Sequence, residues 1–332
     1  MFDAHTLAII FIGLMALATL LYAILDGYDL GVGILLPLDK QDHADTMVAS
    51  IGPFWDANET WLVLAVGLLL IAFPTAHSLV LRELYLPSAV LLIGLILRGV
   101  AFDFRAKAAF SHKPSWDKAF KIGSLIASLA QGYMLGRYVV GFNTDVMSYA
   151  FAILSAVGVS AAYCFIGATW LVMKTEGELQ KKAISWASST LYIMFAGILA
   201  VSAANVIISP EILAKWLVMP NALFVLPFPI LAAVFYWHIH SALKSLRKGD
   251  LTQQNKPFMY AVGTFVVTFA GLGFSYFPYV VPGKMTIWEA VAAPEALNFM
   301  LYGAIIVVPT ILAYTAYSYR VFWGKVQELR YY

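Results

Sequence analysis

The chain has 332 residues, of which 61% are hydrophobic, 15% aromatic and only 12% charged, and its mean hydropathy is +0.79. This composition excludes a soluble globular protein and predicts an all-α polytopic membrane protein. The net charge of +2 is too small to indicate nucleic-acid binding. The single cysteine, Cys164, excludes an internal disulfide and a cysteine-based metal or iron–sulfur site.

Nine apolar runs are long enough to cross a bilayer core, which takes about 20 helical residues. The first run follows an N-terminus with neither a basic region nor a small-residue cleavage site, so we expect it to be a retained span. The nine predicted spans are 7–27, 55–73, 79–101, 119–141, 149–173, 185–208, 220–243, 258–281 and 297–321.

The connections between these runs fall into two sets that differ in basic residues. The set rich in Lys and Arg comprises 40–50, 103–118, 174–184, 244–257 and the tail after 320. The other set carries little more than Lys215 and Lys284, in 74–78, 142–148, 209–219 and 282–296. The positive-inside rule therefore predicts that the basic set is cytoplasmic, with the N-terminus outside and the C-terminus inside.

Five charged side chains are predicted to meet at the cytoplasmic level of the membrane. They are Asp26 and Asp29 at the end of the first span, Asp56 and Glu59 at the start of the second, and Arg98 at the end of the third. Each acidic pair is three residues apart, so its members share a helix face. Intramembrane charges are costly and usually face the protein interior and pair with one another. Four acids against one arginine leave an excess of negative charge.

This excess predicts proton transfer, because partly desolvated carboxylates close to like charges can bind and release protons near neutral pH. Asp56 is the predicted gate of a cytoplasmic proton path, with Asp29, Asp26 and Glu59 as relay sites and Arg98 as the compensating charge. An alternative stays open for each acid. Near a helix end it can also reach into the headgroup layer or cap a helix, as Asp56 could do after Pro53.

Other charged groups are predicted to have no role in chemistry. Asp103, Arg105 and Lys107 resemble a solvated cytoplasmic face, and so do Glu176 and Glu178 with Lys181 and Lys182.

No metal or haem site is predicted in this chain. His238 and His240 are two residues apart and so point to different helix faces. The sequence also contains no phosphate-binding loop, dinucleotide fingerprint or HExxH zinc motif.

Several motifs closely resemble subunit II of cytochrome bd-type quinol oxidases. The specific ones are residues 26–33 (DGYDLGVG), 55–58 (WDAN) with Trp61 and Leu62, and 97–105 (LRGVAFDFR). Weaker matches at 177–179, 277–282, 286–290 and 309–314 extend the resemblance over essentially the whole chain. The short connections most resemble the cyanide-insensitive branch. Glu59 stands where members of the family can carry Gln, and it adds a charge that the family pattern does not require.

The resemblance implies one integral membrane domain, 1–332, with nine transmembrane helices. These would form two four-helix bundles, about 7–141 and 149–281, plus one peripheral helix at about 297–321. The chain would pack against a homologous, haem-bearing subunit I in a bacterial inner membrane. Within the motifs, Arg98, Asp103, Trp55 and Asn58 are predicted to serve charge compensation and assembly.

The implied function is that of a subunit in a respiratory quinol:oxygen oxidoreductase, not catalytic alone. The complex would oxidise quinol on the outer side and reduce O₂ to water with cytoplasmic protons. Haem b and haem d, or a b-type haem in place of haem d, would lie in subunit I. Subunit II would support the haem region and contribute a proton path. A quinone or lipid bound to this chain and a small single-helix subunit are further expectations.

Two alternatives from other classes stay open at this point. A proton-coupled transporter would also carry acids and prolines within its spans. A purely structural partner subunit would keep full turnover after its acids are neutralised.

Overall fold

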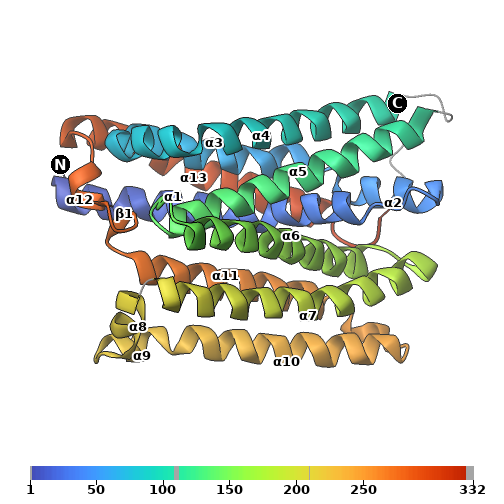
Figure 1. The fold of residues 1–332 in the computed structure, drawn as a ribbon. Helices are drawn as coiled ribbons and strands as arrows, with labels where there is room; N and C mark the ends of the chain where they lie inside the picture. The colour runs from blue at the N-terminus through green and yellow to red at the C-terminus, as the bar shows by residue number, and fades with distance from the viewer. Residues whose placement is uncertain (1, 108–111, 209, 327–332) are drawn as a thin grey trace.

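The computed structural model describes residues 2–107, 112–208 and 210–326. Parts of two segments predicted to be cytoplasmic, at 108–111 and 327–332, therefore lie outside the described residues. Within these described residues, nine long helices run side by side, and shorter elements lie at the two ends of this array (Figure 1). The long helices are α1 (Ala4–Leu35), α3 (Trp55–Ala72), α4 (Pro74–Lys107), α5 (Lys113–Val139), α6 (Val146–Lys174), α7 (Gly177–Ile208), α10 (Pro227–Arg247), α11 (Lys256–Tyr276) and α13 (Pro294–Val321).

The short elements lie in the connections. At one end of the array, after α1, is α2 (Gln41–Ile51); at the other end are α8 (Pro210–Leu217), α9 (Asn221–Val225), α12 (Ile287–Ala290) and the strands β1 (Tyr279–Val281) and β2 (Met285–Thr286). The two strands pair antiparallel, Tyr279 opposite Thr286. A 3₁₀ turn, η2 (Leu251–Gln253), precedes α11.

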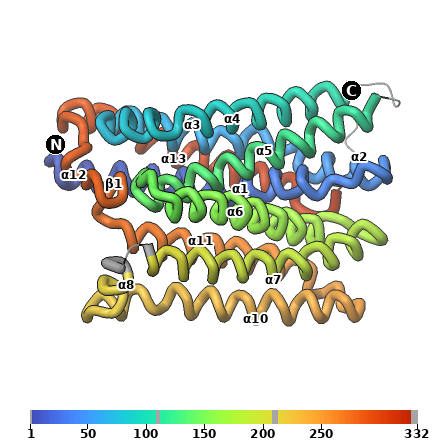
Figure 2. The backbone as a smooth tube through the Cα atoms, in the orientation of Figure 1, coloured from blue at the N-terminus to red at the C-terminus, as the bar shows by residue number. Residues whose placement is uncertain are grey.

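Eight segments in the described part of the chain are long and apolar enough to cross a membrane, which confirms an all-α polytopic membrane protein. They correspond to eight of the nine predicted spans. The ninth prediction, 119–141, falls on α5, whose 27 residues include buried polar side chains at Ser124, Ser128 and Arg137. These polar groups make α5 less apolar than its neighbours, but it lies between α4 and α6 along most of their length (Figure 2).

Local sequence explains where several helices begin. The Asp3 carboxylate accepts a hydrogen bond from Thr6 N at 3.3 Å before α1, and Asp145 accepts one from Ser148 N at 3.0 Å before α6. Such N-caps satisfy backbone donors that have no partner within the helix. Proline, which lacks an N–H, occupies the first position of α4, α10 and α13.

The first helix differs from its prediction, because α1 continues to Leu35 instead of ending near residue 27. The DGYDLGVG motif is therefore helical and fully buried. Its glycines allow close contact with α6. A Cβ atom on Gly31 would lie 1.8 Å from the Tyr163 carbonyl oxygen, and one on Gly167 would lie 2.6 Å from Val32 N. The backbones of α1 and α6 thus touch directly, and only glycine fits at this crossing.

An aromatic cluster joins segments that are far apart in the sequence. The Tyr28 ring of α1 stacks on Trp170 of α6 with centroids 4.3 Å apart, and Phe54, just before α3, stacks on Tyr319 of α13 at 4.5 Å. Phe258 of α11 packs edge-on against Tyr28 and Trp170. The cluster holds α6, α11 and α13 against the part of α1 that carries the DGYDLGVG motif.

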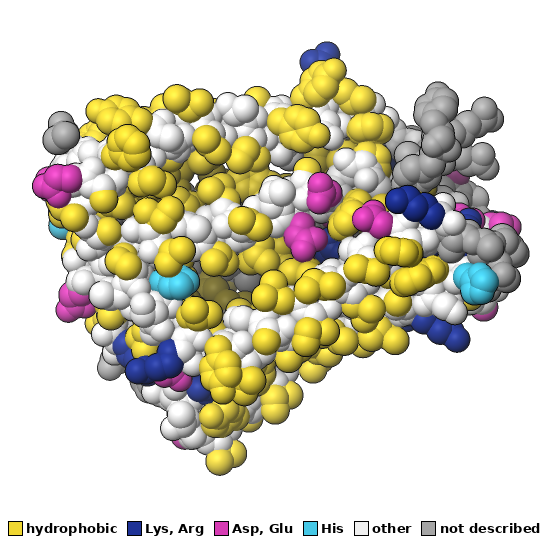
Figure 3. Space-filling view, turned by 90° about the horizontal axis from the view of Figure 1, so that it is seen from above, with side chains coloured by type: hydrophobic (Ala, Val, Ile, Leu, Met, Phe, Trp, Pro, Cys, Tyr) yellow, Lys and Arg dark blue, Asp and Glu magenta, His cyan; other side chains and the backbone are white. Residues whose placement is uncertain are grey.

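The outer surface is largely apolar. Seen from above, hydrophobic side chains cover much of the face on the α3 and α4 side, and a few acidic side chains lie among them (Figure 3). Exposed residues of α4 include Leu86, Ile93 and Ile96. Apolar exposure on this scale fits contact with lipid or with another membrane protein.

Candidate functional site

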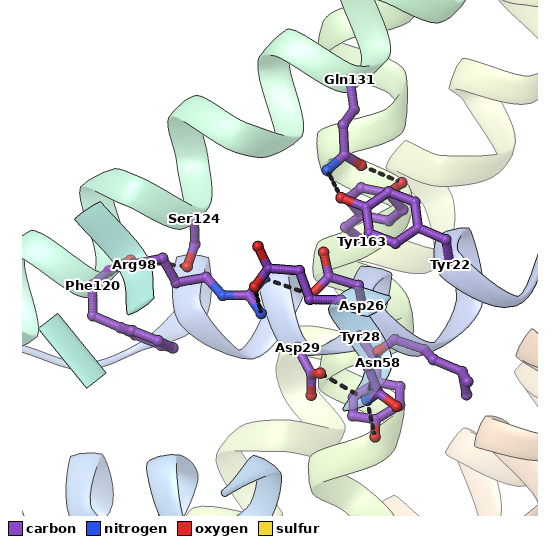
Figure 4. A network of polar contacts seen from close by, with 12 residues as sticks. Tyr22, Asp26, Tyr28, Asp29, Asn58, Arg98, Phe120, Ser124, Gln131 and Tyr163 are labelled. Atoms are coloured by element: carbon purple, nitrogen blue, oxygen red, sulfur yellow. Dashed lines mark hydrogen bonds and ion pairs between the residues drawn. The ribbon is translucent and has the colours of Figure 1, made fainter. Parts of the chain in front are cut away.

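A buried ion pair lies at the centre of the predicted acidic cluster. Arg98 Nη1 of α4 donates to Asp26 Oδ1 of α1 at 2.6 Å, and both side chains are at most 1% exposed (Figure 4). Glu59 of α3 lies on the other side of the guanidinium, with its Oε2 3.7 Å from Arg98 Nη2 and 27% of its side chain exposed. Three helices thus bring two acids to one arginine, as the sequence predicts.

Asp29 does not pair with Arg98 but with an amide. Asn58 Nδ2 donates to Asp29 Oδ2 at 2.8 Å and lies 3.0 Å from the Tyr28 hydroxyl. The Tyr319 hydroxyl donates to Asn58 Oδ1 at 3.3 Å and also contacts the Tyr28 hydroxyl. Tyr319 of α13 therefore completes this second polar group, which lies next to the aromatic cluster.

A third polar group, which sequence analysis missed, lies one helical turn from Asp26. Gln131 of α5 donates to the Tyr22 hydroxyl and accepts from the Tyr163 hydroxyl at 2.8 Å (Figure 4). Tyr22 precedes Asp26 by four residues on α1, so the two side chains share a helix face. In the sequence, this spacing and the position of Gln131 inside an apolar run are the features that indicate a buried polar contact.

Several polar atoms of the cluster have no hydrogen-bond partner within the described residues. They are Asp26 Oδ2, Asp29 Oδ1, and Arg98 Nε and Nη2. Buried polar atoms are nearly always hydrogen-bonded. The cluster therefore retains acceptors and donors that can take part in further hydrogen bonds.

The remaining predicted site residues lie at the edge of the cluster or outside it. Trp55 packs against Phe102 with ring centroids 4.7 Å apart, and the Arg98 guanidinium lies 5.8 Å from its ring centroid. Asp56, in the first turn of α3, is exposed, and so is Asp103. The structure thus brings together Asp26, Asp29, Asn58, Glu59, Trp55 and Arg98, and leaves Asp56 and Asp103 on the surface of this chain.

One predicted solvated group is corrected. Arg105 is buried, forms an ion pair with Asp117 of α5, and lies 2.7 Å from Asp45 Oδ1 of α2. Burial raises the pKa of Asp45, but the hydrogen bond and charge of Arg105 outweigh it and hold that pKa below its usual value. In the sequence, residues 103–107 resemble a solvated face because the acids that pair with Arg105 lie on other helices. The Glu178–Lys181 pair, by contrast, is exposed as predicted.

The histidines of the second half have aromatic neighbours on other helices. His238 stacks on Tyr260 with centroids 5.0 Å apart, whereas His240 Nδ1 lies 3.3 Å from the Tyr192 hydroxyl. The two rings therefore contact different helices, α11 and α7. Among the described residues, no group of three or more His, Cys, Asp or Glu side chains is placed to hold a metal ion.

Comparison with known proteins agrees with this arrangement. The chain is 26% identical to cytochrome bd-I ubiquinol oxidase subunit 2 of Escherichia coli K12, over 99% of this chain and 97% of that protein. It is also 26% identical to cytochrome bd ubiquinol oxidase subunit 2 of Bacillus subtilis 168, over 97% and 95%. The solved bd oxidase of Geobacillus thermodenitrificans contains a chain with the same fold, at a TM-score of 0.78, 16% identity, and coverage of 96% and 98%. The family model for cytochrome bd terminal oxidase subunit II matches residues 7–322, and the chain therefore belongs to that family.

Proposed function

We propose that this chain serves a quinol:oxygen oxidoreductase by conducting protons from the cytoplasmic side through its buried polar cluster. As a member of the subunit II family, the chain is part of a bd-type terminal oxidase complex that contains haem and a subunit I. The observation that supports the proton role is the buried Arg98–Asp26 pair, reached from the surface through the partly exposed Glu59. Charges within membrane spans commonly mark proton relays, in addition to any contact that they stabilise between helices.

The proposed path begins at the exposed Asp56 and continues one helical turn along α3 to Glu59. From Glu59 a proton passes beside Arg98 to Asp26, whose Oδ2 has no other hydrogen-bond partner among the described residues. Arg98 keeps its positive charge throughout. Each proton that enters is taken up by one of the neighbouring carboxylates, Glu59 or Asp26. Tyr22, Gln131 and Tyr163 continue the polar line beyond Asp26, and Asp29 with Asn58 forms a side branch that positions α1 against α3.

The haem-bearing subunit I is proposed to cover the α3 and α4 face. Asp56 and part of Glu59 are exposed on this chain beside apolar helix surface, and a protein partner would supply polar neighbours that lipid lacks. Haem in the partner would supply the electron transfer to oxygen, and this chain would supply protons to it. The histidines described above do not offer a haem site here.

The topology proposed for this role has nine spans. α5 is the ninth: its buried Ser128 contacts Ser160 of α6 at 3.0 Å, and its buried Ser124 lies beside Gly33 of α1. The two bundles would be α1, α3, α4, α5 and α6, α7, α10, α11, with α1 and α5 packed against α6 where the two groups meet. Basic residues at the end of the array near α2 support a cytoplasmic position for that end, which puts the N-terminus outside.

The test is oxygen consumption by the purified complex carrying Asp56→Asn or Glu59→Gln. Both changes keep the side-chain shape and remove a proton site. We expect Asp56→Asn, which removes the predicted gate, to slow turnover about tenfold or more, towards the roughly 10²–10⁴-fold typical of a lost proton-transfer group, and the haem spectrum to stay unchanged. Glu59→Gln should slow turnover less, because the resemblance allows Gln at that position. Asp42→Asn, which alters an exposed acid of α2, is the matched control. Parental rates in both variants over a broad pH range would leave the purely structural alternative in place.

A further inference from the structure

A polar cleft of about 190 Å³ lies between α10 and α11, away from the acidic cluster. Its polar lining comprises His238, Ser241, Ser245, Gln253, Lys256 and Tyr260. The α10 residues are separated by three and four positions and the α11 residues by four, so each set lies along one helix face. A cleft lined by polar side chains between two apolar membrane helices requires a polar occupant or water.

The hydrogen bonds in the cleft leave particular donors available. Ser245 Oγ donates to Asp250 Oδ2 at 2.9 Å, and Asp250 Oδ1 also accepts from Thr252 N at 3.1 Å, so this acid is already paired. Ser241 Oγ and Lys256 Nζ make no hydrogen bond to any described residue. The His238 ring stacks on Tyr260 and closes the side of the cleft farther from the loop 248–255, which joins α10 to α11.

The charges around the cleft attract an anion. The segment from the last turn of α10 to the start of α11 carries four basic residues, Lys244, Arg247, Lys248 and Lys256, against the single acid Asp250, a net charge of +3. Lys256 is also the first residue of α11, where the helix dipole adds positive potential. Lysine and arginine side chains near a membrane surface attract anionic lipid.

We propose that this cleft binds the phosphate of an anionic glycerophospholipid headgroup, with Lys256 and Ser241 as its donors. A free phosphate ion would meet the same donors, but the surface next to the cleft favours a lipid. Next to lining residues in the sequence, α10 exposes 70% of Trp237 and α11 exposes 60% of Met259. These side chains offer apolar area for acyl chains directly beside the polar pocket, as an interfacial lipid needs.

The test is lipid titration of the detergent-purified complex, followed by native mass spectrometry with phosphatidylglycerol and, separately, with phosphatidylcholine. We expect tighter binding of phosphatidylglycerol. Lys256→Gln should weaken that binding about five- to tenfold, because it removes one charge-assisted contact. Ser241→Phe, which fills the cleft without changing charge, should weaken it to a similar extent. Lys248→Gln is the control, since it removes an equal charge from the same loop without altering the lining.

Two results would overturn the proposal. Equal losses in Lys248→Gln and Lys256→Gln, with no effect of Ser241→Phe, would mean that the loop attracts anionic lipid without a site. Inorganic phosphate that displaces phosphatidylglycerol from the parental complex at millimolar concentration, but not from Lys256→Gln, would make the occupant a free anion. Turnover in oxygen should be parental in all three variants, which separates this site from the proton path.

Discussion

Replacing Arg98 by methionine should strongly destabilise the assembled complex. The Arg98 and Asp26 side chains are at most 1% exposed and 2.6 Å apart, so the substitution leaves a buried carboxylate without its counter-ion. Breaking such a pair typically costs about 3–5 kcal/mol, or roughly a hundredfold or more in the folding equilibrium. The contact with Glu59 adds little to this figure, because it spans 3.7 Å and Glu59 is partly exposed.

The double variant Arg98→Met with Asp26→Asn separates charge from packing. It removes both charges, so most of the lost stability should return even though proton transfer is impaired. The assay is the thermal midpoint at which the detergent-purified complex dissociates, read by size-exclusion chromatography with haem absorbance. A parental midpoint in Arg98→Met, or a double variant no more stable than the single one, would show that the ion pair is not what holds α1 to α4.

Two further outcomes follow from packing and from surface charge. Gly31→Ala should abolish assembly, because its Cβ would lie 1.8 Å from the Tyr163 carbonyl oxygen, whereas Gly13→Ala, with no atom within 4 Å, should be tolerated; equal yields of complex would contradict the close crossing. Asp45→Asn should cost at most about 1 kcal/mol at neutral pH, since Asp45 is partly exposed. Because Arg105 lowers the pKa of Asp45, that loss should shrink as the pH falls through this lowered pKa, and a loss independent of pH would refute the pairing.

Much of the fold is predictable because membrane spans follow from length and hydropathy. The meeting of Asp26, Glu59 and Arg98 is likewise predictable, since charges within spans are too costly to face lipid. The exposure of Asp56 also has a simple reason. Asp56 and Asn58 are two residues apart, about 200° around the helix, so when Asn58 points to Asp29 its neighbour must point outward.

Other features depend on pairings between distant helices. Tyr22, Gln131 and Tyr163 are neutral, so a glutamine inside an apolar run indicates a polar contact but does not identify its partners until helix rotation is known. Arg105 looks solvated beside its charged neighbours, yet the α4–α5 hairpin brings Asp117 to it. Such contacts are set by how closely backbones approach, which a single sequence does not reveal.

The contact between Tyr319 and the Tyr28–Asn58 pair has a consequence for biosynthesis. Tyr28 and Tyr319 are 291 positions apart, so α1 and α13 meet only after the ribosome has made all the helices between them. Until then Asn58 and Tyr28, already inserted, lack their final partner. Completion of this polar group therefore requires that α13 has been made and inserted, and a chain truncated before α13 would leave Tyr28 and Asn58 without the Tyr319 hydroxyl.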